Sequence, residues 1–249
     1  MGISQQADLL HDHRRIWEEK PALRAIYADF HQRLERSCPP GALLDIGSGS
    51  AHFKTFRPDG VSLDILPFHG IDVVADAHRM PLADASFSGI VMLDVLHHLQ
   101  RPLAFLREAA RVLNPGGRLA MIEPGMSLLS TPIYRHLHEE PVEMAANPFD
   151  EHVVQSGGDP WDSNQAIPTL MFSTAEARRR LERAVPELKL IEFRWLSLMA
   201  YPLSGGFQKW SLLTEGMVGP LLAAEDAVMA ALGRWLAFRV YVVLERVRT

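Results

Sequence analysis

The chain has little cysteine: Cys38 is the single thiol among 249 residues. One cysteine cannot close an internal disulfide, so the sequence excludes a disulfide-stabilised scaffold and suits a reducing compartment. The first ten residues also lack a basic region followed by an apolar core, so they predict no secretory signal. We therefore expect a cytoplasmic protein.

The sequence likewise lacks an excess of positive charge and long apolar runs. Its formal net charge is −5 at pH 7, whereas nucleic-acid binders carry a basic field that neutralises phosphates. No uncharged apolar run reaches the roughly 18 residues that a membrane-spanning helix requires. These deficits disfavour a nucleic-acid partner and a membrane span. With 47% hydrophobic residues, residues 1–249 can bury a full core as a single domain.

The most informative stretch that is present covers residues 43–51, LLDIGSGSA. An apolar strand ends there in Asp45-Ile46, and Gly47 and Gly49 follow. Glycine lets the backbone approach a ligand closely and adopt positive φ in a tight strand-to-helix turn. The dinucleotide fingerprint requires a small residue at position 52, where this chain has His52. The spacing therefore disfavours a nicotinamide-dependent enzyme, which stays a secondary alternative.

The rest of the first half alternates strands with helices. The other expected strands cover residues 61–64, 71–75, 88–94 and 117–123, and Pro102 begins a crossover helix. This alternation predicts a doubly wound α/β sheet. Asp45, Asp64 and Asp76 lie at the carboxyl ends of three successive strands, where open α/β sheets bind ligands. Each acid alone also fits a turn or a strand end.

With these motifs in order, residues 41–124 resemble the class I S-adenosylmethionine-dependent methyltransferases, specifically the small-molecule type 11 group. The resemblance rests on LLDIGSGSA, VSLDI, DVVADAHRMPLADASFSGIVMLDVLHHL and RVLNPGGRLAMIEP. It implies a Rossmann-like seven-stranded methyltransferase sheet with helices on both faces, and S-adenosyl-L-methionine as the cofactor. The chain departs from the family at Ala51, where a third glycine is usual.

The resemblance also assigns roles to residues at the strand ends. Asp45, Gly47, Ser48 and Gly49 would shape the methionine side of the cofactor pocket. Asp64 would hold the ribose beside Ile65, and Asp76 with the Ala77 backbone would read the adenine. Asp94 is expected at the same pocket, and Met80 would supply an apolar wall.

Methyl transfer from a sulfonium needs aligned, dry reactants, and a general base is optional. For a hydroxyl acceptor, His97, His98 or His138 would take the proton, since histidine titrates near neutrality. The alternative is that these histidines only form pocket walls. Asp94, His97 and His98 also share a spacing that suits a divalent ion. The sequence identifies no further ligand, so it predicts no metal site.

The remaining segments are expected to surround this core. We predict an N-terminal helical cap (1–40), a cofactor-binding core (41–124), a substrate-lid insertion after the fifth strand (125–172), and C-terminal helices with the last strands (173–249). A capping-box pattern at Ser173 and Glu176 predicts a helix to about residue 185, and strands are expected at 188–196 and 236–244. The rival interpretation of the lid is a surface insertion without acceptor contact.

The tail from 195 to 233 is unusually apolar. We expect a helical pair that packs on the core or on a second subunit, the alternative being peripheral contact with a lipid-linked acceptor. The predicted function is methyl transfer to a small molecule, with oxygen as the favoured acceptor atom and a sugar- or lipid-linked biosynthetic intermediate as the favoured substrate. A non-catalytic cofactor-binding module of the same fold is the alternative from another class.

Overall fold

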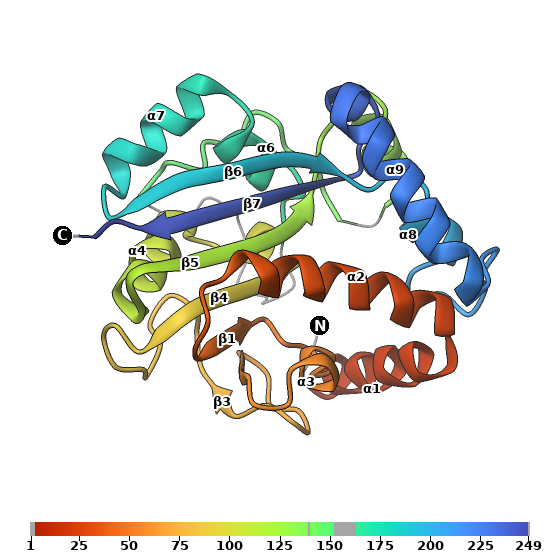
Figure 1. Ribbon diagram of the computed structural model, residues 1–249, viewed down its shortest axis with the longest axis horizontal. Coiled ribbons are helices and arrows are strands. Elements are labelled where there is room, and N and C mark those ends of the chain that lie inside the picture. Colours follow the sequence, from red (N-terminus) through yellow and green to blue (C-terminus); the bar gives the residue numbers. More distant parts are fainter. Residues whose placement is uncertain (1–2, 139, 152–162, 249) are drawn as a thin grey trace.

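The computed structural model describes residues 3–138, 140–151 and 163–248. Its strands form one sheet in the order β3-β2-β1-β4-β5-β7-β6 (Figure 1). The strands are β1 (Leu43–Ile46), β2 (Val61–Asp64), β3 (Val73–Val74), β4 (Phe87–Leu93), β5 (Leu113–Pro124), β6 (Leu188–Leu196) and β7 (Arg239–Arg246). The pairs among β1 to β5 are parallel, whereas β7 lies antiparallel between β5 and β6. The seven-stranded Rossmann-like sheet is confirmed.

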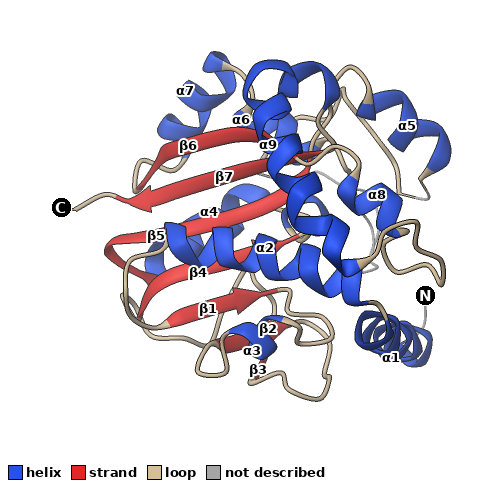
Figure 2. Ribbon diagram, turned by 45° about the vertical axis from the view of Figure 1, so that its right-hand side comes forward, coloured by secondary structure: helices blue, strands red, loops and turns tan. Residues whose placement is uncertain are grey.

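Helices cover both faces of the sheet (Figures 1 and 2). They are α1 (Ile3–Glu19), α2 (Pro21–Ser37), α3 (Phe53–Phe56), α4 (Pro102–Val112), α5 (Ser130–Leu137), α6 (Ile167–Phe172), α7 (Ala175–Ala184), α8 (Ala200–Ser204) and α9 (Glu215–Leu236), with a 3-10 turn at Leu96–His98. Helices α2, α8 and α9 contribute to the core on one face, and α4, α6 and α7 to the core on the other.

The strand sequences explain this two-sided burial. Along β4, Ile90 and Met92 enter the core under α4, while Val91 between them enters the core under α2. A strand alternates its side chains, so a central strand buried on both faces reads as a continuous apolar run. Tyr241 and Val243 of β7 alternate in the same way with their apolar neighbours. The continuous runs in the sequence are therefore strands of a buried sheet.

The predicted N-terminal cap consists of two helices. The apolar residues that predicted the second one are all buried in α2: Leu23, Ile26, Tyr27, Phe30 and Leu34. Helix α2 contacts β4, β5 and α9, so it is a layer of the main fold as well as a cap. Helix α1 packs beside it at the carboxyl edge of the sheet (Figure 2).

Two predicted boundaries are wrong by a few residues. The N-cap of α7 is Thr174, whose hydroxyl accepts the Ala177 N–H at 3.1 Å, whereas Ser173 still has helical backbone at the end of α6. The last strand begins at Arg239, because α9 continues to Leu236. Residues 236–244 are apolar except for Arg239, and such a short run carries no clear signal for the point where a helix gives way to a strand.

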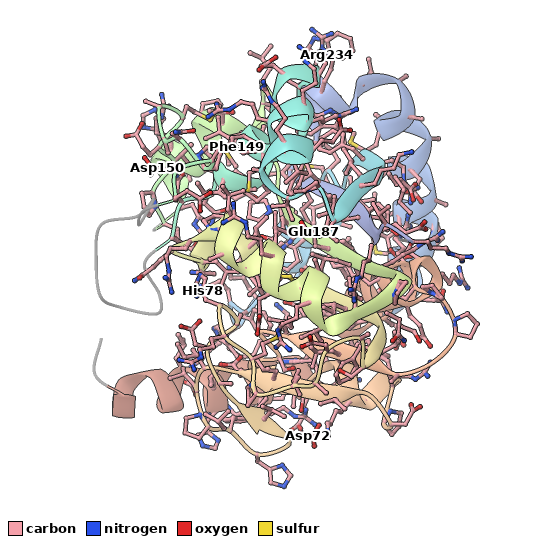
Figure 3. All side chains as sticks on the ribbon, turned by 90° about the vertical axis from the view of Figure 1, so that its left-hand side faces the viewer. Asp72, His78, Phe149, Asp150, Glu187 and Arg234 are labelled. Carbon is pink, nitrogen blue, oxygen red and sulfur yellow. The ribbon has the colours of Figure 1, made fainter. Side chains whose placement is uncertain are left out.

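The predicted lid at 125–172 divides into two parts. Helix α5 lies at the carboxyl edge, as expected for a lid, but Ile167, Met171 and Phe172 of α6 are fully buried in the main core. Residues 141–151 are tied to the body: Arg107 pairs with Glu151 at 2.6 Å, and Arg180 lies over the Phe149 ring at 4.5 Å. Figure 3 shows Phe149 beside α7. The last part of the predicted lid is therefore core. Residues 139 and 152–162 of that segment lie outside the described residues, and its role over an acceptor stays a prediction.

The apolar tail forms α8 and α9, so the predicted helical pair is present. Helix α9 is long and apolar enough to cross a membrane by length and composition alone. Its middle is nevertheless tied to the fold, because Glu225 is buried and Asp226 pairs with Arg33 of α2 at 2.8 Å. In this structure α9 packs against α2 and β6.

Candidate active site

A cavity of about 1150 Å³ lies at the carboxyl edge of β1, β2 and β4. It is lined by every residue that the sequence assigned to cofactor or acceptor: Asp45, Gly47, Ser48, Gly49, Asp64, Ile65, Asp76, Ala77, Asp94, His97, His98 and His138. Met80, the expected apolar wall, is buried and does not line the cavity. The fold thus brings the predicted residues together, while their roles stay predictions.

The glycine turn after β1 forms one end of the cavity. Gly47 and Gly49 have positive φ of 68° and 53°, and the Gly47 N–H donates to the Leu63 carbonyl at 2.9 Å. A Cβ at Gly47 would lie 2.3 Å from a methyl carbon of Val95, so only glycine fits. Ala51 occupies the position where the resemblance leads one to expect glycine, and its φ is also positive at 58°. Left-handed backbone at a non-glycine residue costs about 1 kcal/mol.

Asp64 connects this turn to β2. One carboxylate oxygen accepts the Gly49 N–H at 2.8 Å, and the other accepts the Leu66 N–H at 2.8 Å. Burial raises the pKa of Asp64 although these N–H groups oppose the shift. Each carboxylate oxygen has a second lone pair, so Asp64 can still accept bonds from a pair of hydroxyl groups.

Asp45 is a buried acid that faces the cavity without a cationic partner among the described residues. Burial raises its pKa to about 7, and the neighbouring Asp64 charge adds to the shift while Ser48 opposes it. A buried carboxylate is stabilised by a positive charge nearby. The methionine end of the cofactor carries an ammonium and a sulfonium, so this end of the cavity suits it electrostatically.

Asp76 is placed differently. Its carboxylate accepts the His78 backbone N–H at 2.9 Å and contacts the His78 ring at 2.6 Å. Although partial burial opposes the shift, these contacts lower the pKa of Asp76. Ile65 lines the cavity with 49% of its surface exposed, which is available for an apolar ring. The part of the cavity predicted to hold the adenine therefore offers an exposed apolar side chain, with the Asp76 carboxylate nearby.

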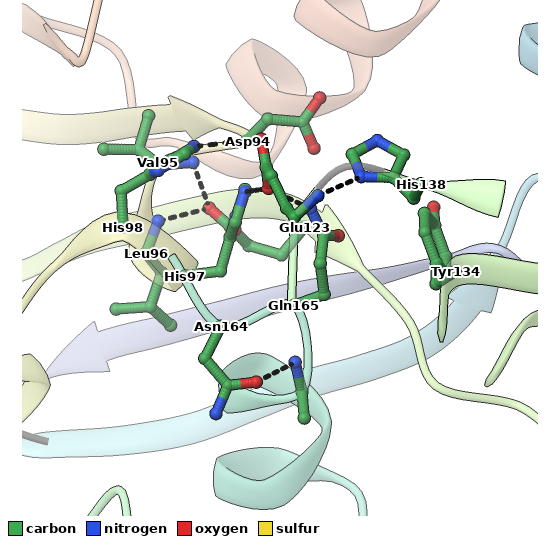
Figure 4. A network of polar contacts seen from close by, with 12 residues as sticks. Asp94, Val95, Leu96, His97, His98, Glu123, Tyr134, His138, Asn164 and Gln165 are labelled. Atoms are coloured by element: carbon green, nitrogen blue, oxygen red, sulfur yellow. Dashed lines mark hydrogen bonds and ion pairs between the residues drawn. The ribbon is translucent and has the colours of Figure 1, made fainter. Parts of the chain in front are cut away.

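A second, polar part of the cavity lining lies at the turn after β4 (Figure 4). Glu123, at the end of β5, accepts the Val95 and Leu96 N–H groups at 2.8 Å each and contacts His97 Nδ1 at 2.8 Å. His97 Nε2 lies 3.3 Å from Glu140. Burial opposes a charged ring, but both carboxylates outweigh it and raise the pKa of His97 to about 10. Both ring nitrogens of His97 thus face carboxylates, which is poor geometry for a free base.

The other predicted histidines lie around the same cluster. His98 Nε2 is 3.9 Å from Glu140, and His138 Nδ1 accepts the Glu140 N–H at 3.2 Å. Asp94 turns away: its carboxylate pairs with the buried Arg239 of β7. Among the described residues, the group whose ligand-type atoms lie within 4.8 Å of one another is His97, His98 and Glu140, and Asp94 is not part of it.

Sequence reasoning missed Glu123, Glu140 and Arg239. Glu123 carries a usable signal, since it ends a central strand at the same edge as the predicted acids. Glu140 reaches the cluster through the loop after α5, and Arg239 through an antiparallel strand more than a hundred residues later. These placements follow from tertiary structure rather than from local spacing.

The comparisons agree with this geometry. Residues 44–121 match the family model described as a methyltransferase domain. The 27-O-demethylrifamycin SV methyltransferase of Amycolatopsis mediterranei is 51% identical over 47 residues, covering 19% of this chain and 17% of that protein. The malonyl-[acyl-carrier protein] O-methyltransferase of Methylococcus capsulatus is 34% identical over 37% of this chain and 40% of that protein. Residues 44–121 are therefore a methyltransferase domain, in agreement with the resemblance to the class I S-adenosylmethionine-dependent methyltransferases.

A solved structure extends the likeness to the whole fold. An S-adenosylmethionine-dependent methyltransferase from Thermotoga maritima has a TM-score of 0.55 at 16% identity, covering 96% of this chain and 97% of that one. At this identity it shows the fold alone. S-adenosylmethionine is the cofactor of the family and of this chain. The chain spans less than half the length of these two curated relatives.

Proposed function

We propose that this protein transfers the methyl group of S-adenosylmethionine to a hydroxyl oxygen of a small-molecule acceptor. One observation carries the proposal: a single cavity is lined both by the glycine turn with Asp64 and by a polar cluster of His97, His98 and Glu140, of which His97 is buried. The first set of residues suits the cofactor, and the second suits a hydroxyl that must lose a proton.

In this proposal, some residues bind the cofactor and others accept the proton of the methyl acceptor. Asp45 would balance the positive methionine end, Asp64 would hold the ribose hydroxyls, and Ile65 would cover the adenine. The cofactor supplies an activated methyl carbon, so its carbon–sulfur bond breaks as the carbon–oxygen bond forms, with the electron pair returning to sulfur. The acceptor proton passes to the cluster around Glu140.

Oxygen is favoured over nitrogen by the cluster and by two relatives. A neutral amine can attack the methyl carbon with its free lone pair, whereas an alcohol is a poor nucleophile until its proton is removed. A group that accepts a proton is therefore most useful for a hydroxyl acceptor. The names of the rifamycin and malonyl-carrier relatives both denote methyl transfer to an acceptor of biosynthetic type. A sugar- or lipid-linked intermediate would use the apolar walls from α5 and from residues 199–210.

Calorimetry followed by turnover tests the proposal. S-adenosylmethionine and its demethylated product should bind, whereas NAD should give no heat. Labelled methyl groups should then appear on members of a panel of hydroxylated acceptors, with an amine panel as the control. Binding of the cofactor without transfer to any acceptor would favour the non-catalytic module instead. Transfer to amines alone would contradict the oxygen assignment.

A further inference from the structure

Two imidazoles and a carboxylate converge at the acceptor end of the cavity. One ligand-type atom from each of His97, His98 and Glu140 lies within 4.8 Å of the other two. His97 Nε2 lies 3.3 Å from Oε2 of Glu140, and His98 Nε2 lies 3.9 Å from its Oε1. Zinc bonds of about 2.0–2.1 Å place neighbouring tetrahedral ligands roughly 3.3 Å apart. The three groups are therefore close to the spacing of a metal site.

The surroundings of His97 resemble those of a metal ligand. Glu123 contacts His97 Nδ1, so it fixes the ring and directs Nε2 toward Glu140. Metal-bound histidines commonly have their second nitrogen held by a carboxylate, which sets the tautomer and the ring orientation. Glu123 is itself fixed by two backbone N–H groups and is fully buried. The two histidines are thus held by β5 and the turn after β4, and Glu140 is supplied by the loop after α5.

The two carboxylates in the cluster would be stabilised by a nearby cation. Glu123 and Glu140 place two carboxylates beside the two imidazoles, and among the described residues neither forms an ion pair with lysine or arginine. A divalent ion held by two neutral imidazoles would cancel both carboxylates.

We propose that His97, His98 and Glu140 bind one divalent transition-metal ion that coordinates the acceptor oxygen. Two nitrogens and one carboxylate are the donor set of zinc and of other borderline ions, whereas magnesium and calcium prefer oxygen ligands. Three protein ligands leave a coordination position that faces the cavity. A hydroxyl bound there loses its proton more easily. The proton would pass to His138, which lies beside Glu140 in the cavity lining and is not a ligand. This role of the metal rests on the proposed function.

Binding of Co²⁺ and Zn²⁺ to the untagged full chain tests the site. After dialysis against a chelator, Co²⁺ should produce visible absorption bands at a stoichiometry of one, and Zn²⁺ should give heat and displace it. His98→Asn and Glu140→Gln should weaken Zn²⁺ binding at least tenfold, because each removes one ligand. His136→Asn changes an exposed histidine of α5 outside the cluster and should bind as the parent does.

The outcomes separate the metal from the methyl transfer. Heat with the demethylated cofactor shows that each variant is folded and keeps its cofactor site, whatever the metal result. Absence of Co²⁺ bands in the parent, or unchanged Zn²⁺ affinity in both ligand variants, would overturn the metal site and leave the proposed function standing. Metal binding in a protein that binds no cofactor would instead overturn the proposed function.

Discussion

At the scale of single residues, we expect the Asp45 carboxylate to lower the stability of the cofactor-free protein and to strengthen cofactor binding. Its pKa is raised to about 7 in the folded chain, chiefly by burial, against an ordinary value of 3.8. The folded state therefore holds the proton more tightly, and stability falls as pH rises from about 4 to 7. We expect Asp45→Asn to stabilise the cofactor-free protein at pH 8 by roughly 2–4 kcal/mol, and to differ little at pH 4.

The same substitution should weaken the cofactor at least tenfold, because the positive methionine end loses its counter-charge. Urea unfolding at the two pH values and calorimetry at pH 8 measure both effects. A variant that is destabilised at pH 8, or that binds the cofactor as the parent does, would show that Asp45 braces the turn and nothing more.

Asp64 is expected to act on binding in a different way. Asp64→Ala should weaken cofactor binding by roughly 1–3 kcal/mol, since ribose hydroxyls would be left without an acceptor in a closed site. It also removes the bonds to the Gly49 and Leu66 N–H groups, so unfolding must be measured beside calorimetry. Asp59→Ala, at an exposed carboxylate, is the control. An unchanged dissociation constant would place the ribose elsewhere.

Prediction from the sequence is strongest for these residues. Asp45, Asp64 and Asp76 each end a strand, and parallel topology alone brings strand ends to one edge. Glu140 and Arg239 could not be found in this way, because a loop and an antiparallel strand deliver them. The cofactor class came from the resemblance over four motifs, of which the glycine turn is one, whereas nothing local indicated that Glu123 would contact His97.

At the scale of elements, residues 197–210 form a cavity wall held by two buried charges. Lys20, between α1 and α2, donates to the carbonyls of Ser204, Gly206, Gln208 and Trp210 at 2.6–2.9 Å. The Glu225 carboxylate accepts the N–H groups of residues 198–200 at 2.6–3.0 Å. The apolar pattern predicted a helical pair here, but it gave no sign that charges from distant helices would shape the loop.

Lys20→Met should therefore loosen this wall. Four carbonyls lose a buried ammonium partner, so we expect a loss of roughly 3 kcal/mol in the free energy of unfolding. Proteolytic cleavage should appear within 204–210, while cofactor affinity stays within a few-fold because Asp45 and Asp64 are on another wall. Lys209→Met, at an exposed lysine of the same loop, should change neither. Equal protease resistance in the two variants would contradict this role for Lys20.

At the scale of the whole molecule, the N-terminal helices meet the sheet through buried histidines. His31 of α2 packs between Phe53 and Phe56, with ring centroids 5.2 and 5.1 Å away, and its ring nitrogens find no hydrogen-bond partner within the described residues. His52 follows the glycine turn and packs on Trp17 at 4.7 Å. The helical periodicity predicted that this cap would be buried, but it could not show that imidazoles would lie within it.

Acid should therefore separate the cap from the sheet. Burial lowers the pKa of His31 to about 3, and burial with positive neighbours lowers that of His52 to about 3, against an ordinary value of 6.5. The unfolded chain binds these protons first, so the stability they contribute is complete above pH 6.5 and is lost as pH falls toward 3. Protonation linked to each histidine should lower the free energy of unfolding by roughly 2 kcal/mol between pH 6.5 and pH 5.

Replacing His31 alone measures how much that histidine contributes to the loss of stability at acid pH. His31→Phe keeps an aromatic ring among Phe53 and Phe56 but cannot be protonated, so its free energy of unfolding should fall less steeply below pH 6.5 than that of the parent. His69→Ala removes an exposed histidine and should keep the parent slope. Denaturant titrations at pH 7, 6 and 5 compare the three proteins. Parallel slopes for His31→Phe and the parent would mean that the acid sensitivity arises elsewhere, and that the cap stays on the sheet when His31 is protonated.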